Sequence, residues 1–314
     1  MTSPARFRQR LRNALQSVLL LAAMAALAGY LGWALFGAAG LVWAAVLGPL
    51  IVALGQDVSP RLVLRLTGAA AIAPQQAPGL YRILDALAER AGLPVAPRLY
   101  YVPSRVLNAF AAGGRREPAI AVTDGLLRAM ERREVAGILA HEISHLRSND
   151  VWVMTLADVV GRITGLLSIL GQLLLFVWVP LALLTGSGFP LLPIVVLILA
   201  PTISGLLQLA LSRTREYDAD IAAVELTGDP RGLASALDKL ERLQGGWIER
   251  MFMARMPKWL KTHPATHVRI RRLLELETER TPAPYVAESY AEDPFFERPI
   301  VARGPRWHWH GLWY

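Results

Sequence analysis

The pattern of apolar positions is dominated by two long runs that contain no charged side chain. The first covers residues 13–56, which is 44 positions, and the second covers residues 163–212, which is 50 positions. A helix needs about 20 apolar residues to cross a bilayer, so each run is long enough for two crossings joined by a turn. We therefore predict four transmembrane helices in two hairpins, at 16–36, 40–55, 164–184 and 190–210.

Two other interpretations of these runs are weaker. A cleaved signal peptide has an apolar stretch of about 7–15 residues, whereas the first run is much longer and a second apolar segment follows it directly. The second run could instead be a buried hairpin of a soluble protein. Its 50 residues without any charge argue against this alternative.

Basic residues indicate how the predicted helices are oriented. Arginines flank both runs, whereas the short turns inside the runs carry no charge. Because basic residues are retained on the cytoplasmic side, we expect a multi-pass protein of the plasma (inner) membrane with both termini and the large polar segments in the cytoplasm. The arginines concerned are Arg6, Arg8, Arg10, Arg12, Arg61, Arg65, Arg162, Arg213 and Arg215.

The charge and the composition of the chain argue against several classes of function. The formal net charge is +8, but much of the excess lies beside the predicted spans, where basic residues meet anionic lipid. The expected partner is therefore the lipid bilayer and not nucleic acid. The apolar runs contain no Asp, Glu, Lys, Arg or His, which argues against a transporter or channel. The chain has no cysteine, so a zinc site would have to use histidine and carboxylate ligands.

A candidate metal motif lies between the two runs, where positions 141–145 read HEISH. Apolar residues recur at helical spacing along 131–150 and fall opposite the two histidines, which predicts a helix. On that helix His141 and His145 lie on one face about one turn apart and can bind a single ion, and Glu142 lies beside them as a general base. Three fixed residues would match by chance in about one chain in a hundred, so the motif needs support from its surroundings.

Support comes from the segment that follows the second run. Glu216 and Asp220 are four residues apart and would share one helical face. We predict Glu216 as the third metal ligand, and Asp220 as the acceptor for the outer nitrogen of a metal-binding histidine. The alternative is a solvated charged turn at the start of a helix. The histidine motif on the other side of the hairpin favours the ligand.

The polar segments show further elements. We predict a helix at 76–92, strands at 98–102 and 119–123, a helix of about two turns from Asp124, and mainly helix in 212–280. The expected organisation is an N-terminal transmembrane hairpin (1–56), the first part of a catalytic domain (57–162), a second hairpin (163–211), the second part of the catalytic domain (212–280) and an extended aromatic tail (281–314).

Together these motifs resemble the M48 family of membrane zinc metallopeptidases, and most closely the HtpX type of bacterial heat-shock protease. The resemblance covers nearly the whole chain. It rests on the two spans before the motif, the sequence NAFA at 108–111, the HEISH motif, the two spans after it, EYDAD at 216–220, and His263-Pro264 with Arg269. The aromatic tail is a departure from the family pattern.

The resemblance implies a fold and an activity. The fold would be mainly α with a small β-sheet: a four-helix transmembrane protein with a cytoplasmic gluzincin-like domain. One Zn²⁺ would be bound by His141, His145 and Glu216, with Glu142 catalytic. The substrates would be membrane proteins or unfolded polypeptides in quality control. Our candidate for stabilising the oxyanion is His263, and a surface histidine without a catalytic role is the alternative.

Substrate would bind as an added strand, which gives affinity through main-chain hydrogen bonds with little dependence on sequence. The small residues of 108–114 suggest such an edge, formed by Asn108, Ala109, Phe110 and Ala111, although the segment could also be a loop between strands. Two other functions stay open: a catalytically silent zinc-binding membrane scaffold, and a prenyl-peptide processing protease. The oligomeric state is not predicted.

Overall fold

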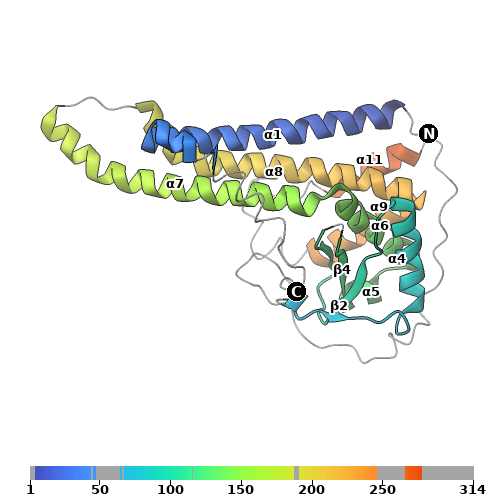
Figure 1. The fold of residues 1–314 in the computed structure, drawn as a ribbon. Coiled ribbons are helices and arrows are strands. Elements are labelled where there is room, and N and C mark those ends of the chain that lie inside the picture. Colours follow the sequence, from blue (N-terminus) through green and yellow to red (C-terminus); the bar gives the residue numbers. More distant parts are fainter. Residues whose placement is uncertain are drawn as a thin grey trace. The chain divides into compact units, whose positions relative to one another are not determined.

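The computed structural model describes residues 4–43, 45, 46, 64, 65, 67–114, 116–186, 191–245 and 266–277. Contacts divide the chain into two compact units. The first comprises Met1–Asp57 and Trp152–Arg215, and the second comprises Val58–Val151 and Glu216–Tyr314. Two long helices, α7 (Asp150–Thr185) and α8 (Leu191–Thr227), contribute residues to both units (Figure 1). The two units are described in turn.

The first unit is built from α1 (Pro4–Phe36) and from the greater part of α7 and α8. Each of the three helices has an apolar stretch long enough to cross a membrane, at Leu11–Phe36, Trp152–Thr185 and Leu192–Thr227. The predicted spans 16–36 and 164–184 lie inside the first two stretches, and 190–210 lies largely inside the third. The predicted span 40–55 falls largely outside the described residues.

Small apolar clusters join the three helices of this unit. Leu31 of α1 packs with Leu197 and Ala200 of α8, and all three are at most 4% exposed. Many other apolar side chains of these helices are exposed, with Phe176 82% and Leu184 85% exposed. A surface of this kind is expected for helices that face lipid.

A polar contact joins α7 to α8 within the apolar region. Pro201 lies inside α8 and has no N–H, so the carbonyl of Leu197, four residues earlier, lacks its usual helical donor. The buried Ser168 hydroxyl of α7 donates to that carbonyl, and the Gln172 amide donates in turn to Ser168. Satisfying an orphaned carbonyl in this way is how a proline is tolerated inside a membrane helix.

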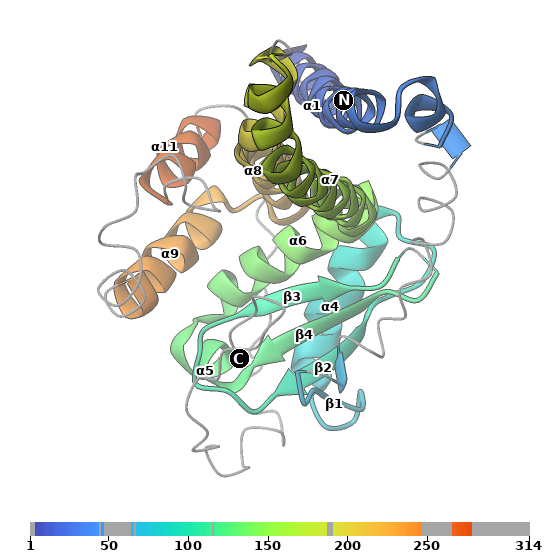
Figure 2. The ribbon, with the colours of Figure 1, turned by 90° about the vertical axis from the view of Figure 1, so that its left-hand side faces the viewer.

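The second unit contains a four-stranded sheet in the order β1-β2-β4-β3 (Figure 2). Its strands are β1 (Ala70–Ala71), β2 (Arg98–Val102), β3 (Ala109–Ala112) and β4 (Ala119–Thr123). The central pair β2–β4 is parallel, and the outer pairs are antiparallel. The strands predicted at 98–102 and 119–123 are confirmed. The segment 108–114 contains the edge strand β3, so the loop interpretation is wrong.

Helices cover one face of this sheet. They are α4 (Pro78–Ala91), α5 (Asp124–Ala129) and α6 (Arg132–Ser148), and the main core lies between them and the strands. The predictions of a helix at 76–92, a short helix from Asp124 and a helix around the HEISH motif are confirmed, with ends within two residues of the prediction for the first and the third. The unit also contains α9 (Pro230–Leu240), a π-helical turn (Glu241–Gly245) and α11 (Thr266–Glu277).

Close packing holds α6 against α9. A Cβ on Gly137 would lie 3.0 Å from the backbone nitrogen of Leu233, so a larger residue at 137 would force the helices apart. At the start of α6, the Glu134 carboxylate caps the backbone N–H of Glu131 and binds Ser235 and Lys239 of α9. The helix that carries the HEISH motif is therefore fixed on several sides.

Candidate metal centre

The two histidines of the motif face each other on α6, as their spacing predicts. Nε2 of His141 lies 3.2 Å from Nε2 of His145, and the rings are nearly perpendicular, with an interplanar angle of 89°. Both rings are largely buried, with side chains 10% and 16% exposed. The opposite side of α6, including Leu139 and Ile143, is fully buried in the core. The apolar stripe thus sets which way the histidines point.

Glu216 of α8 completes a group of three donors. Its Oε2 lies 3.5 Å from Nε2 of His141, and its Oε1 lies 3.9 Å from Nε2 of His145. One ligand atom from each residue falls within 4.8 Å of the others. Tetrahedral zinc with bonds of about 2.0–2.2 Å places its ligand atoms about 3.3–3.6 Å apart, so this donor set fits such an ion. The predicted convergence of these three residues is present in the structure.

Carboxylates lie behind both histidines. Oδ1 of Asp220 is 3.1 Å from Nδ1 of His141, so the residue lies beside a histidine of the motif, and its role as a hydrogen-bond acceptor stays a prediction. The contact is an ion pair without a well-aligned hydrogen bond. Oδ2 of Asp150 is 2.8 Å from Nδ1 of His145. Sequence analysis did not single out Asp150, because it is five residues after His145 and a continuous helix would place it on another face.

Arg269 of α11 binds the two carboxylates of α8. It donates to both oxygens of Asp220, at 2.6 and 2.8 Å, and its Nη1 lies 2.9 Å from Oε2 of Glu216. Its side chain is only 8% exposed. The sequence offered Arg269 only as part of the family resemblance, and the structure places it beside Glu216 of the donor group.

Glu142 lies next to the donor group and reaches the edge of the sheet. Its Oε2 accepts a hydrogen bond of 2.9 Å from the backbone N–H of Ala111 in β3. Since β4 pairs with the other side of β3, this N–H points outward from the sheet edge. Burial raises the pKa of Glu142, which brings a carboxylate closer to the range in which it can exchange a proton at neutral pH.

Oppositely charged side chains face one another in the centre. Burial opposes protonation of His141, but its pairing with Asp220 and Glu216 outweighs burial and raises its pKa to about 10. Burial likewise opposes ionisation of Glu216 and Asp220. The pairing of Glu216 with His141 and the charge of Arg269 nevertheless hold the pKa of both carboxyls below the usual range. The centre therefore contains two ionised carboxylates, and the guanidinium of Arg269 balances part of their charge.

The predicted substrate residues lie along β3. The backbone of Asn108 pairs with Thr123 at the end of β4, through hydrogen bonds of 2.9 and 3.0 Å. Backbone groups alternate in direction along a strand, so Ala109 and Ala111 present theirs to the open edge, while Phe110 faces β4. Their role in binding substrate stays a prediction. The predicted catalytic residue His263 and the tail lie outside the described residues.

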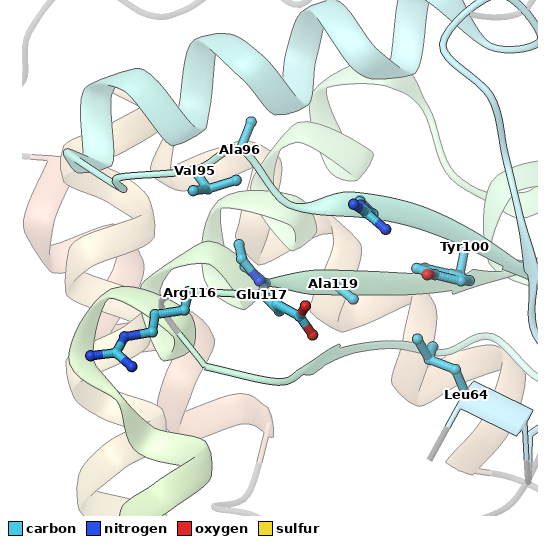
Figure 3. Close-up of a pocket in the computed structure, with 9 residues that line it drawn as sticks. Leu64, Val95, Ala96, Tyr100, Arg116, Glu117 and Ala119 are labelled. Atoms are coloured by element: carbon cyan, nitrogen blue, oxygen red, sulfur yellow. The ribbon is translucent and has the colours of Figure 1, made fainter. Parts of the chain in front are cut away.

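A surface pocket lies on the sheet away from the donor group. It is lined by Arg98 and Tyr100 of β2, by Arg116 and Glu117, and by Leu64 (Figure 3). Tyr100 and Leu64 belong to the smaller apolar cluster on the sheet face opposite α6. None of the lining residues is a predicted site residue, so the pocket does not alter the assignment of the centre.

Comparison with known proteins places this arrangement in a family. Residues 74–277 match the model of peptidase family M48. Two proteins named Protease HtpX homolog match over most of their length. The one from Paraburkholderia phytofirmans is 34% identical over 302 residues, covering 84% of this chain and 97% of the relative. The one from Acaryochloris marina is 36% identical over 299 residues, covering 88% of this chain and 98% of the relative.

Among solved structures, S. mikatae Ste24p matches 85% of this chain with a TM-score of 0.48 and 20% identity. The matched part is 66% of that protein's length, so this chain spans just under two thirds of it. The family match and the two curated relatives confirm the resemblance drawn from the motifs: this chain belongs to peptidase family M48.

Proposed function

We propose that the protein is a membrane-embedded zinc endopeptidase that cleaves cytoplasmic parts of membrane proteins or unfolded polypeptides. The observation that carries this proposal is the meeting of three elements at one point: the donor group of His141, His145 and Glu216, the Glu142 carboxylate, and the open edge of β3. A metallopeptidase needs a metal, a base and a means of holding an extended chain, and these elements would supply them.

His141, His145 and Glu216 would bind the zinc ion, which would lower the pKa of a water molecule to about 7 and polarise the peptide carbonyl. Glu142 would take the proton from the attacking water and deliver it to the leaving amine. The raised pKa of Glu142 suits both steps, because the group must hold the proton briefly and then release it. His263 remains our candidate for an additional donor to the oxyanion.

Substrate would lie against β3 as an added strand. Ala109 and Ala111 have small side chains, so a second backbone can approach the edge closely, and affinity would come from main-chain hydrogen bonds with little regard to sequence. Binding of this kind suits a protease that removes damaged proteins, since such substrates share no sequence. The relatives' shared name, Protease HtpX homolog, is consistent with a proteolytic activity.

We also propose four membrane spans, in the plasma (inner) membrane, with both termini and the centre in the cytoplasm. Three apolar helices support part of this topology, and the flanking arginines support the orientation. The cytoplasmic placement can be checked with reporter fusions at residues 38 and 187, inside the two predicted extracytoplasmic turns, and at the two termini.

The test of the activity compares the wild type with Glu142→Gln in detergent, with bound metal and casein cleavage measured on the same samples. Glu89→Gln, an exposed change of the same kind on α4, is the control. Glu142→Gln should keep its zinc and lose about 10²–10⁴-fold in turnover, because it lacks the proton-accepting carboxylate. Cleavage at the wild-type rate by this variant would refute the assigned base and would favour a scaffold that holds zinc only for structure.

A further inference from the structure

Asp150 lies directly behind the second histidine of the metal centre. Its Oδ2 is 2.8 Å from Nδ1 of His145, and its side chain is only 4% exposed. We propose that Asp150 is a positioning residue that holds the His145 ring with Nε2 toward the metal and thereby sets the metal affinity of the site. This inference rests on the proposed function, because it takes His145 as a metal ligand.

The chemistry of the contact supports this role. An imidazole binds a metal through one nitrogen, and a carboxylate on the other nitrogen fixes the tautomer, prevents rotation of the ring and increases its basicity. The outer nitrogen of His145 is the one that faces Asp150, while its Nε2 faces His141 and Glu216. The ring therefore already has the orientation that binding requires.

The break between two helices is what brings Asp150 to this position. Residues five apart on a continuous helix are rotated by about 140° from one another and cannot meet. Here α6 ends at Ser148, and Asn149 adopts a left-handed backbone with φ 58°. Asp150 then begins α7. The turn at Asn149 directs the carboxylate back toward His145, so the local backbone serves the metal site.

The two histidines are held by independent elements. Asp220 belongs to α8 and is itself bound by Arg269 of α11, whereas Asp150 comes from the start of α7. Of the two contacts, the one between His145 and Asp150 has the geometry of a hydrogen bond, and the one between His141 and Asp220 does not. Asp220 is therefore not expected to compensate for the loss of Asp150.

A purely structural role makes a different prediction. An acidic residue in the first turn of a helix stabilises that helix through its dipole, so Asp150 could simply strengthen the start of α7. Its removal would then lower the stability of the metal-free protein and leave the affinity for metal unchanged. A positioning role requires that metal affinity fall, and that the electronic environment of the bound metal change.

The experiment uses the full-length protein in detergent, with the variants Asp150→Ala and Asp150→Asn. Zinc affinity is measured by competition with a chromophoric chelator, the ligand field by the visible spectrum of the Co²⁺-substituted protein, and stability by thermal unfolding without metal. Asp150→Ala should bind zinc about 10–100-fold more weakly and give a shifted Co²⁺ spectrum. Asp150→Asn should show a smaller loss, because its amide oxygen still accepts a hydrogen bond.

Asp124→Asn is the matched control. Asp124 is also a buried acid at the first position of a helix, but its carboxylate binds Tyr101 and Arg128, which are not site residues. It should keep the wild-type zinc affinity and Co²⁺ spectrum whatever its effect on stability. A second pair of variants tests the turn: Asn149→Gly should retain affinity, since glycine adopts the left-handed conformation, and Asn149→Val should lower it.

Wild-type affinity and an unchanged Co²⁺ spectrum in both Asp150 variants would overturn the inference, even if both variants unfolded at lower temperature. That result would leave the proposed function intact as long as the wild type bound zinc and Glu142→Gln lost cleavage. Failure of the wild type to bind zinc would instead overturn the proposed function itself.

Discussion

Arg269 and Asp220 are 49 residues apart in the chain and form a bidentate ion pair, with N–O distances of 2.6 and 2.8 Å. The same guanidinium lies 2.9 Å from Glu216. One arginine thus binds both Glu216 of the donor group and Asp220, the carboxylate behind His141. α11 takes part in the centre although it carries no residue of the donor group.

This relationship predicts that Arg269→Lys will weaken the site while leaving every ligand in place. A lysine has one ammonium and cannot bind both oxygens of Asp220 while also reaching Glu216. We expect zinc affinity to fall about 10-fold or more. Arg269→Ala should also destabilise the protein by about 3–5 kcal/mol, because two buried carboxylates lose their cation.

Arg272→Lys is the control for this prediction, since Arg272 is exposed on the same helix and stacks on the ring of Tyr217. Affinity is measured by chelator competition, and stability by denaturant unfolding. Equal zinc affinity in Arg269→Lys and Arg272→Lys would show that Arg269 does not hold the ligand.

A second prediction concerns the edge strand. Ala111→Pro removes the N–H that binds Glu142, and with it one outward donor of β3. Peptide turnover should fall by at least about 10²-fold, in the range seen when a general base is impaired, while bound zinc should stay near the wild-type amount. Turnover and metal content measured on one preparation check this expectation.

Ala109→Pro distinguishes the two proposed roles of β3, which are to hold Glu142 and to bind substrate at the open edge. It also removes an outward-facing N–H from β3, but Glu142 is bonded to Ala111 and not to Ala109. We expect a higher KM and a smaller loss of kcat than for Ala111→Pro. Parallel loss of zinc and turnover in Ala111→Pro would mean that the substitution disrupts the fold, and the edge-strand role would lose its support.

The sequence was sufficient to predict the residues of the centre whose spacing follows helical geometry. His141 and His145 on one face of α6, and Glu216 and Asp220 on one face of α8, required only the period of the helix. Asp150 could not be found in this way, because its position depends on a left-handed residue between two helices. An asparagine followed by an acid shortly after the motif is the one available signal, since asparagine tolerates that conformation.

Prediction of the fold from the sequence has similar limits. The strands β2 and β4 are rich in residues that favour sheets and were predicted with their observed ends. β3 has only four residues, and three of them are alanines, which have a weak preference for strands, so the sequence allowed both an edge strand and a loop. Its pairing with β4 decides between them, and the pairing of one strand with another is not encoded in the periodicity within either strand.

A third prediction uses pH. Burial opposes ionisation of Glu134, but its hydrogen bonds to Lys239, Ser235 and the backbone of Glu131 outweigh burial and hold its pKa below 4.5. The ionised group therefore stabilises the fold fully above about pH 4.5, and this stabilisation is lost as the pH falls through the lower folded-state pKa. Glu134→Gln should cost about 1–3 kcal/mol at pH 7 and progressively less in acid.

Denaturant unfolding of the metal-free protein at pH 7 and in steps below pH 4.5 measures this difference. Asp238→Asn is the control, because Asp238 pairs with Arg242 on an exposed surface and should contribute little at any pH. If the difference in unfolding free energy between wild type and Glu134→Gln stayed constant down to the lowest pH, the prediction would be contradicted.

A fourth prediction concerns the membrane helices. Ser168→Ala leaves the Leu197 carbonyl without a donor, and should destabilise the packing of α7 against α8 by about 0.6–1.7 kcal/mol. In a Pro201→Ala background, the new backbone N–H of residue 201 can bind that carbonyl, so the cost of Ser168→Ala should nearly vanish. Unfolding of the four proteins in mixed detergent gives the coupling energy, and additive effects would exclude this explanation of the serine.

The distance along the chain between the ligands has a consequence for biosynthesis. His145 and Glu216 are separated by 71 residues (145 to 216), and the whole second apolar run lies in that interval. Arg269 follows later still. The whole second apolar run must therefore be synthesised before the third residue of the donor group emerges from the ribosome. The metal centre that we propose consequently cannot assemble until late in the synthesis of the chain.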